Sequence, residues 1–321
     1  MKILVTGSAG HLGEALMRTL RARRIDAVGL DVLPSEFTDI NGSIVDRATV
    51  DASMRGVTAV LHAATLHKPH VASHSRQAFV DVNVTGTLNL LEAAVAEKVR
   101  CFIYTSTTSS FGDALTPPAG APAAWITEDV APIPKNIYGV TKVAAEDLCR
   151  LFHRNQRLPC LVLRTSRFFP EQDDVPEKRA AFDGDNLKIS ELLYRRVDVE
   201  DVVAAHLCAL DKAGELGFGR FIISATTPFT RADAAELGRD APRVLARAVP
   251  EFPAIYSALG WKMLPTLDRV YDNERARLLL GWQPQYDFRR ALQAIADGAD
   301  WRSPLARAIG SKGYHRQDGA A

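Results

Sequence analysis

The stretch KILVTGSAGHLG, residues 2–13, decides the fold that the sequence predicts. An apolar, β-branched run leads directly into a turn that contains Gly7, Gly10 and Gly13. GEALMRTLRARR at 13–24 then carries apolar side chains at helical spacing, and IDAVGLD at 25–31 is typical of a second strand. A glycine-rich turn between a strand and a helix lets the backbone approach a pyrophosphate, and the helix N-terminus attracts the phosphates. A plain glycine turn is the alternative, but this context favours a dinucleotide-binding unit.

The rest of the chain continues the alternation of strands and helices. This pattern predicts an α/β fold, a doubly wound parallel sheet of the Rossmann type with a small C-terminal substrate lobe. The further strands are expected at 57–64, 100–106, 159–165 and 219–225, and the main helices at 78–98, 137–155 and 199–213. We assign 1–169 and about 195–225 to the dinucleotide-binding domain. The proline-containing stretches, which lack the alternation, form the expected lobe at 170–194 and 226–315.

Composition limits the classes of partner. The 321 residues are 47% apolar, which is ample for a large core, and the formal net charge is +1. This charge gives no reason to expect nucleic acid or an anionic membrane as a partner. The four cysteines lack metal-ligand spacing, and most lie in apolar stretches, so we expect reduced thiols and a cytoplasmic protein. No signal peptide is expected, and no apolar run approaches a membrane span.

Asp31 ends the second predicted strand, 18 positions after Gly13 (31 − 13). A carboxylate there can accept hydrogen bonds from the adenosine ribose hydroxyls, and it would repel a 2′-phosphate. No arginine follows in DVLPSEF to bind such a phosphate, so the sequence favours NAD over NADP. The alternative is that Asp31 only caps a loop.

YGVTK at 138–142 places Tyr138 and Lys142 four residues apart, on one face of a helix. An unperturbed tyrosine has a pKa of about 10, and a nearby ammonium and a positive nicotinamide would both favour the phenolate. Tyr138 could then exchange a proton with a substrate hydroxyl while a hydride moves to or from the cofactor. Such a pair alone is common on exposed helices, but behind a glycine-rich turn it indicates a chemical centre.

Together these motifs resemble the extended short-chain dehydrogenase/reductases, the NAD-dependent epimerase/dehydratase family. The resemblance rests on GSAGHLG at 7–13, NVTGT at 83–87, YTSTTSSFG at 104–112, YGVTK at 138–142 and DNERARLLLGWQP at 272–284. It implies that Thr107, five residues before Gly112, hydrogen-bonds the reacting oxygen, with Ser106 and Thr108 as alternative registers. It also implies a homodimer formed through the helix that carries the tyrosine.

The same resemblance implies a set of cofactor contacts. Lys142 would hold the nicotinamide ribose, and Asn83 would have a role that is more structural than chemical. The cofactor-binding residues implied are Gly7, Gly10, His11, Leu12, Gly13, Asp31, Ser43, Ile44, Ala63, Ala64, Asn83, Tyr138 and Lys142.

The sequence restricts the reaction less closely. Family dehydratases and decarboxylases place an acid just after the catalytic hydroxyl residue, whereas this chain has Thr108 and Ser109. Dehydrogenation, reduction or epimerisation through a transient ketone therefore remains. Only 28 residues (171–198) lie where nucleotide-sugar epimerases clasp the diphosphate, and Tyr194 occupies a position where the family often has an arginine. These departures favour a smaller polyol or sugar acid. A UDP-sugar 4-epimerase and a non-catalytic NAD sensor are the alternatives.

Four further residues are candidates for substrate contacts. His67 could hydrogen-bond the substrate or lie on the surface, and no metal is expected beside it. Arg167 could bind a carboxylate in bidentate fashion, or form an ion pair with Glu171 or Asp173. Thr108 and Arg196 complete the candidate set, and Arg196 could supply a phosphate contact.

Overall fold

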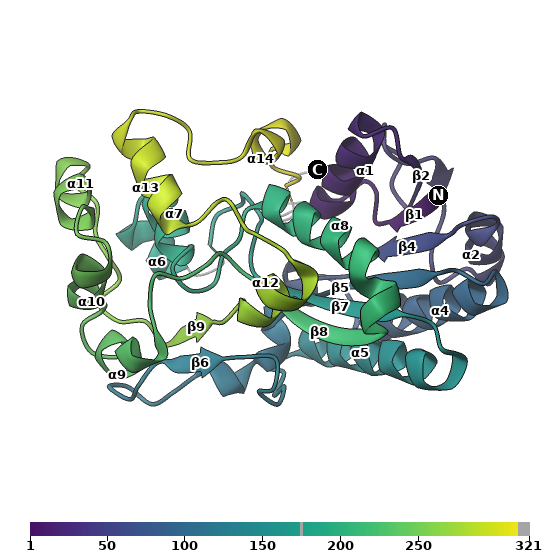
Figure 1. Ribbon diagram of the computed structural model, residues 1–321, viewed down its shortest axis with the longest axis horizontal. Coiled ribbons are helices and arrows are strands. Elements are labelled where there is room, and N and C mark those ends of the chain that lie inside the picture. The colour runs from purple at the N-terminus through teal and green to yellow at the C-terminus, as the bar shows by residue number, and fades with distance from the viewer. Residues whose placement is uncertain (174–175, 314–321) are drawn as a thin grey trace.

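Seven parallel strands form one sheet in the computed structural model, which describes residues 1–173 and 176–313 (Figure 1). Their spatial order is β3-β2-β1-β4-β5-β7-β8, so the order reverses after β1 and the doubly wound prediction is confirmed. All carboxyl ends share one edge, where such sheets bind ligands. The strands are β1 Lys2–Thr6, β2 Asp26–Asp31, β3 Ile40–Asn41, β4 Ala59–His62, β5 Cys101–Thr107, β7 Cys160–Thr165 and β8 Phe218–Ile223.

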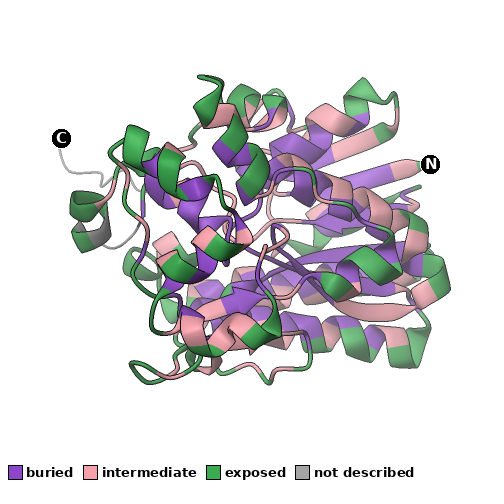
Figure 2. Cartoon of the chain, turned by 60° about the vertical axis from the view of Figure 1, so that its left-hand side comes forward, coloured by how far each residue is buried: buried purple, intermediate pink, exposed green. Residues whose placement is uncertain are grey.

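Helices cover both faces of this sheet. One face carries α1 His11–Ala22 and α8 Val199–Leu216, and the other carries α2 Arg47–Met54, α4 Gly86–Ala96 and α5 Ile137–Gln156. Figure 2 shows the sheet buried between helices whose outer surfaces are exposed. Short segments after β4 and β5 complete this domain: η1 Lys68–Ala72, α3 Arg76–Val80, the π-turn η2 Asp81–Thr85, η3 Thr108–Phe111 and η4 Asp113–Leu115.

The lobe has its own hydrophobic core beyond the carboxyl edge of the sheet. Tyr194, Val244 and Phe288 are among its buried side chains. A small parallel pair, β6 Ala124–Ile126 with β9 Arg269–Tyr271, lies beside it. Its helices are α6 Pro176–Ala181, α7 Gly184–Glu191, η5 Arg231–Asp233, α9 Ala234–Leu237, α10 Ala241–Ala248, α11 Phe252–Ala258 and α13 Phe288–Ala296.

The predicted domain boundaries need correction in two places. Residues 226–315 do not all join the lobe, because α12 Glu274–Leu280 and α14 Pro304–Ile309 pack on α8, and α14 also packs on α1. Trp282 is likewise buried in the core of the sheet domain. Conversely, Ala123 lies in the lobe core although it was assigned to 1–169. The apolar pattern of these segments shows that they are buried, but not against which partner. Residues 314 and 315 lie outside the described residues.

Asp201, in the first turn of α8, attaches the C-terminal segment to the sheet domain. Its carboxylate accepts the backbone N–H groups of Gln285 and Tyr286, both at 2.8 Å. Its carbonyl accepts the indole N–H of Trp282 at 3.0 Å. These bonds hold the lobe over the carboxyl edge of the sheet. Within the described part of the chain, no helix has the length and apolarity to cross a membrane.

Gly13 provides a test of the close packing at the glycine-rich turn. A Cβ at Gly13 would meet the Gly7 carbonyl oxygen at 1.8 Å, whereas a Cβ at Gly214 in α8 would meet nothing within 4 Å. We predict that Gly13→Ala costs about 3 kcal/mol of stability, as a severe packing lesion does. Gly214→Ala, the control, should be neutral or stabilising by up to about 1 kcal/mol. Thermal unfolding measures both, and equal midpoints for the two variants would contradict the packing.

Candidate active site

Helix α5 carries Tyr138 and Lys142 on the face that packs against β5. The Lys142 Nζ donates to the Thr105 carbonyl at 2.6 Å, and the Thr107 hydroxyl lies near enough to the Tyr138 hydroxyl to lower its pKa. Both side chains are almost fully buried. The helix starts where it does because the Asn136 side chain accepts the Gly139 N–H at 3.1 Å. The predicted helical spacing therefore brings the two residues to the carboxyl end of the central strand.

Glu146 lies one further turn along the same face, and sequence reasoning missed it. It is fully buried and accepts the Ser106 hydroxyl at 2.6 Å. Arg164 on β7 donates to it through Nε and Nη2, and Arg220 on β8 through Nε at 3.0 Å. The continued four-residue spacing after Lys142 was the one available signal. Its partners are distant in sequence and could not be inferred.

Burial sets the protonation of this pair. It raises the pKa of Tyr138 to about 12, although the nearby Thr107 hydroxyl acts in the opposite direction. Burial also lowers the pKa of Lys142 to about 7, opposed by the Glu146 carboxylate. The sequence led us to expect that Lys142 lowers the tyrosine pKa. Burial has the larger effect on Tyr138 in this structure, so its hydroxyl holds its proton at neutral pH.

The three hydroxyls at the end of β5 have different partners. Ser106 donates to Glu146, and the Thr108 hydroxyl donates to the Thr165 carbonyl at 3.4 Å. The Thr107 hydroxyl is the one beside Tyr138, and it also accepts the Ser109 N–H at 3.0 Å. The geometry thus supports the register that places the catalytic hydroxyl at Thr107. Because the Thr108 hydroxyl already donates to the Thr165 carbonyl, the structure gives less support to a contact between Thr108 and the substrate.

The glycine-rich turn fits a pyrophosphate. Gly7 has φ +75°, and a Cβ there would meet the Ala64 backbone nitrogen at 2.7 Å. Gly10 is the N-cap of α1 and offers no side-chain acceptor to the N–H groups of the first turn, where His11 and Leu12 lie. A helix N-terminus of this kind is suited to an anion. The residues present therefore fit the predicted cofactor.

The His11 side chain packs against residues that follow β7. Its ring is buried, and Nε2 lies 3.3 Å from the Glu171 Oε1. The His11 and Phe169 rings pack edge to face, with their centroids 5.3 Å apart. Burial lowers the pKa of His11 to about 4, so the imidazole is neutral at pH 7.

Asp31 lies at the carboxyl end of β2, next to the glycine-rich turn. Its carboxylate accepts the Ala9 N–H at 3.0 Å and the Leu33 N–H at 2.9 Å. Ser43 and Ile44 follow β3, the neighbouring strand, and so lie at the same edge. The loop-capping alternative is therefore real, and a ribose contact would be additional to it.

Asn83 joins the loop after β4 to helix α5. It accepts the Leu66 N–H at 2.9 Å and donates to the Thr141 hydroxyl at 3.0 Å. In the same loop, Ala64 donates its N–H to the Thr6 hydroxyl at 3.2 Å, and Ala63 precedes it. These bonds agree with a structural role for Asn83 beside the predicted cofactor path.

His67 is not a surface residue, which corrects one of the two expectations. It is 8% exposed and stacks on Phe169, with the ring centroids 5.3 Å apart. Among residues 1–173 and 176–313, no group of three His, Cys, Asp or Glu side chains is placed to hold a metal.

The predicted substrate arginines form an internal ion network. Arg167 pairs with Asp173 at 2.9 Å, which realises the ion-pair alternative rather than a free carboxylate site. Arg195 pairs with Asp173 at 2.8 Å, and Arg196 pairs with Glu191 at 2.8 Å. Arg196 is therefore not free to supply the predicted phosphate contact by itself.

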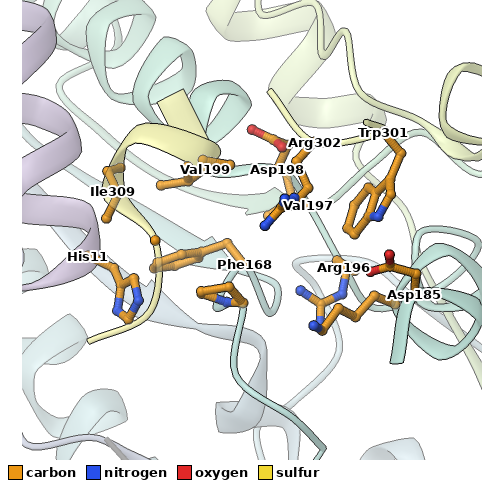
Figure 3. Close-up of a pocket in the computed structure, with 14 residues that line it drawn as sticks. His11, Phe168, Asp185, Arg196, Val197, Asp198, Val199, Trp301, Arg302 and Ile309 are labelled. Atoms are coloured by element: carbon orange, nitrogen blue, oxygen red, sulfur yellow. The ribbon is translucent and has the colours of Figure 1, made fainter. Parts of the chain in front are cut away.

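A pocket lies between the lobe and the sheet domain, and Figure 3 shows its walls. It encloses about 540 Å³ of empty space, part of it open solvent. Neither Tyr138 nor Thr107 lines it. The lining residues are His11, Phe168, Pro170, Asp185, Lys188, Arg196, Val197, Asp198, Val199, Trp301, Arg302, Ala306, Ile309 and Gly310.

Known proteins are similar to this chain in sequence and in fold. Residues 3–222 match the NAD-dependent epimerase/dehydratase family. The UDP-glucose 4-epimerase of Mycolicibacterium smegmatis is 30% identical over 89% of this chain and 94% of its own length. GDP-6-deoxy-D-mannose reductase of Pseudomonas aeruginosa is 27% identical, with 94% of this chain and 97% of the relative covered.

A solved structure is similar over nearly the whole chain. A short-chain dehydrogenase/reductase superfamily protein from Agrobacterium tumefaciens with bound NAD has a TM-score of 0.66 and 26% identity. The similarity covers 96% of this chain and 99% of that one. The chain therefore belongs to the NAD-dependent epimerase/dehydratase family, and it is an NAD-using enzyme of the extended short-chain dehydrogenase/reductase type.

Proposed function

We propose that this enzyme oxidises, reduces or epimerises a secondary alcohol or ketone of a small sugar or sugar acid. The observation that carries the proposal is the placement of the Tyr138 hydroxyl near that of Thr107, with Lys142 one turn along the same buried helix face. A non-catalytic sensor has no need of this arrangement, and the family consists of enzymes.

The side chains divide the work of proton transfer. When bound, NAD supplies the site that accepts or donates the hydride. The Tyr138 hydroxyl, protonated at neutral pH, donates its proton to a substrate carbonyl, or receives one in the opposite direction. Thr107 orients the reacting oxygen through its hydroxyl. Lys142 fixes the nicotinamide ribose, and its positive charge favours the phenolate when it is protonated.

Substrate size separates this proposal from its main alternative. Arg167, Arg195 and Arg196 already pair with Asp173 and Glu191, so they are not free to surround a diphosphate. This supports a substrate smaller than a nucleotide sugar. The second candidate is a UDP-sugar 4-epimerase, which the M. smegmatis relative favours.

Location and assembly are also proposals. The four cysteines carry free thiols, which supports a cytoplasmic protein. Val140 and Leu151 expose apolar side chains on the outer face of α5, which supports a homodimer through this helix. Light scattering that shows a monomer at assay concentration would remove the dimer proposal.

Asp31 provides a test of the preference for NAD over NADP. We expect wild-type enzyme to bind NAD at least about tenfold more tightly than NADP, because the carboxylate repels the 2′-phosphate. Asp31→Ala should narrow this ratio. Asp26→Ala, at the exposed opposite end of β2, is the control and should leave the ratio unchanged. Fluorescence titration measures both affinities, and equal affinities in wild type would remove the argument for Asp31.

Tyr138 provides a test of the proposed proton donor. Tyr138→Phe keeps the ring and should keep NAD binding, but turnover should fall about 10²- to 10⁴-fold. Lys142→Met should weaken both turnover and NAD binding. The control is Tyr286→Phe, whose hydroxyl contacts Glu200 at 3.4 Å in another part of the molecule. The assay follows NADH absorbance with a substrate found by screening sugar acids and polyols. Near wild-type turnover by Tyr138→Phe would show that the mechanism is wrong.

Binding of nucleotide sugars tests the proposed limit on substrate size. With its arginines paired internally, the NAD complex should bind UDP-glucose and UDP-galactose weakly or not at all. Isothermal calorimetry tests this directly. Micromolar binding of either sugar would promote the UDP-sugar 4-epimerase to first place.

A further inference from the structure

The ion network between the lobe and the sheet domain has more cations than anions. Arg167, Arg195 and Arg196 share two carboxylates, those of Asp173 and Glu191. The network is largely buried: the Glu191 side chain is 1% exposed and the Arg196 side chain 4%. Charges removed from water need a partner of opposite sign. Each arginine has a carboxylate partner, but among the described residues the network carries one more positive than negative charge.

Lys188 adds a further cation at the same place. It lies on α7, is half-buried, and forms no hydrogen bond or ion pair with the described residues. Burial lowers the pKa of Lys188, and the positive charges of Arg196, Arg302 and Arg167 lower it further, whereas the Asp185 carboxylate one turn earlier on α7 raises it. Like charges held together at a partly buried position destabilise the protein unless an anion compensates them.

The pocket described above receives these cations. Lys188, Arg196 and Arg302 all line it, and Figure 3 shows Arg196 and Arg302 on opposite sides of the space. Two acids, Asp185 and Asp198, also line it, and the Asp198 carboxylate accepts the Glu200 and Ser303 N–H groups. The Arg302 guanidinium donates to the Asp300 carboxylate through Nε at 3.0 Å and Nη2 at 2.6 Å.

Trp301 gives a second, independent indication of a ligand. It lines the same pocket and is 8% exposed. Its indole N–H is buried and has no acceptor among the described residues. Buried indole N–H groups usually have a partner, so this donor points to a ligand that carries an acceptor.

The chain connects this pocket to the reacting residues. Phe168 and Pro170 form part of its wall and follow β7. The last residue of β7, Thr165, pairs in register with Thr107 on β5. A substrate held at its far end in the pocket would therefore lie over the same edge of the sheet as the Tyr138 hydroxyl.

We propose that this pocket binds an anionic group of the substrate, a carboxylate or a phosphate monoester, with Lys188 as its principal ligand. Arg196 and Arg302 add positive potential, and Trp301 donates a hydrogen bond. The inference rests on the proposed function and narrows its substrate class to sugar acids or sugar phosphates.

The test compares Lys188→Met with Lys212→Met, a lysine exposed on α8 and paired with Glu215. The probes are glucuronate, glucose 6-phosphate and neutral glucose, titrated calorimetrically into the NAD complex. We expect wild type and Lys212→Met to bind at least one anionic probe more tightly than glucose. Lys188→Met should lose at least tenfold of that affinity, and Lys188→Arg should retain most of it. The preferred anionic probe distinguishes a carboxylate site from a phosphate site.

Thermal unfolding without ligand at low salt shows whether the variant folds. Because Lys188 is half-buried and forms no ion pair with the described residues, its removal should leave the midpoint of Lys188→Met at or above that of wild type. Equal affinity of wild type and Lys188→Met for both anionic probes would overturn the inference, and so would a preference of wild type for glucose.

These outcomes are separable from the fate of the proposed function. Turnover of a neutral sugar with NAD, together with no effect of Lys188→Met on any probe, refutes the anion site alone. Anion binding that depends on Lys188, without NADH formation from any sugar acid or phosphate, supports the site and counts against the proposed reaction. UDP-glucose binding that is lost in Lys188→Met supports the anion site and overturns the size limit.

Discussion

The position of the reacting side chains depends on a buried ion pair, Glu146 with Arg164, which fixes helix α5 against the sheet. Both side chains are at most 2% exposed, and Arg220 adds a second guanidinium to the same carboxylate. Because Glu146 also binds Ser106, the helix cannot slide along β5 without breaking the network. Tyr138, two turns earlier on the same face, is thereby held beside Thr107. A buried carboxylate one turn beyond Lys142 thus fixes the position of the residues that we propose to react.

The second constraint is the attachment of the lobe to the carboxyl edge of the sheet. Asp201 binds the backbone at Gln285 and Tyr286, and Asp198 binds that of Ser303, so the C-terminal segment returns to the start of α8. Helix α14 then packs on α1, the helix that begins at the glycine-rich turn. The pocket between the two parts is therefore bounded by residues from both ends of the chain. This arrangement brings Trp301 to the same cavity as His11.

Local patterns in the sequence predict the features that are local in the structure. The glycine-rich turn, six of the seven strands of the parallel sheet and the shared face of Tyr138 and Lys142 follow from strand composition, glycine spacing and helical periodicity. The two-residue strand β3 is too short to carry such a pattern. Features that depend on distant partners could not be predicted. Arg220 is 74 residues from Glu146 along the chain, and the sequence around Arg220 contains no pattern that predicts the contact. The same limit applies to α12 and α14, whose sequences do not show that they pack on α8 rather than in the lobe. It applies also to His67, because its stacking partner Phe169 is distant in the sequence.

The central claim is that hydride chemistry takes place beside the Tyr138 hydroxyl, with the cofactor extended from the glycine-rich turn to α5. A crystal structure of this protein with NAD tests it most directly. The account predicts the pyrophosphate at the N-terminus of α1, the adenosine ribose at Asp31 and the nicotinamide ribose within hydrogen-bond distance of Lys142. The reactive carbon of the nicotinamide should face the space beside Tyr138 and Thr107. A nicotinamide bound away from these two hydroxyls, or an adenosine that makes no contact with Asp31, would contradict the account.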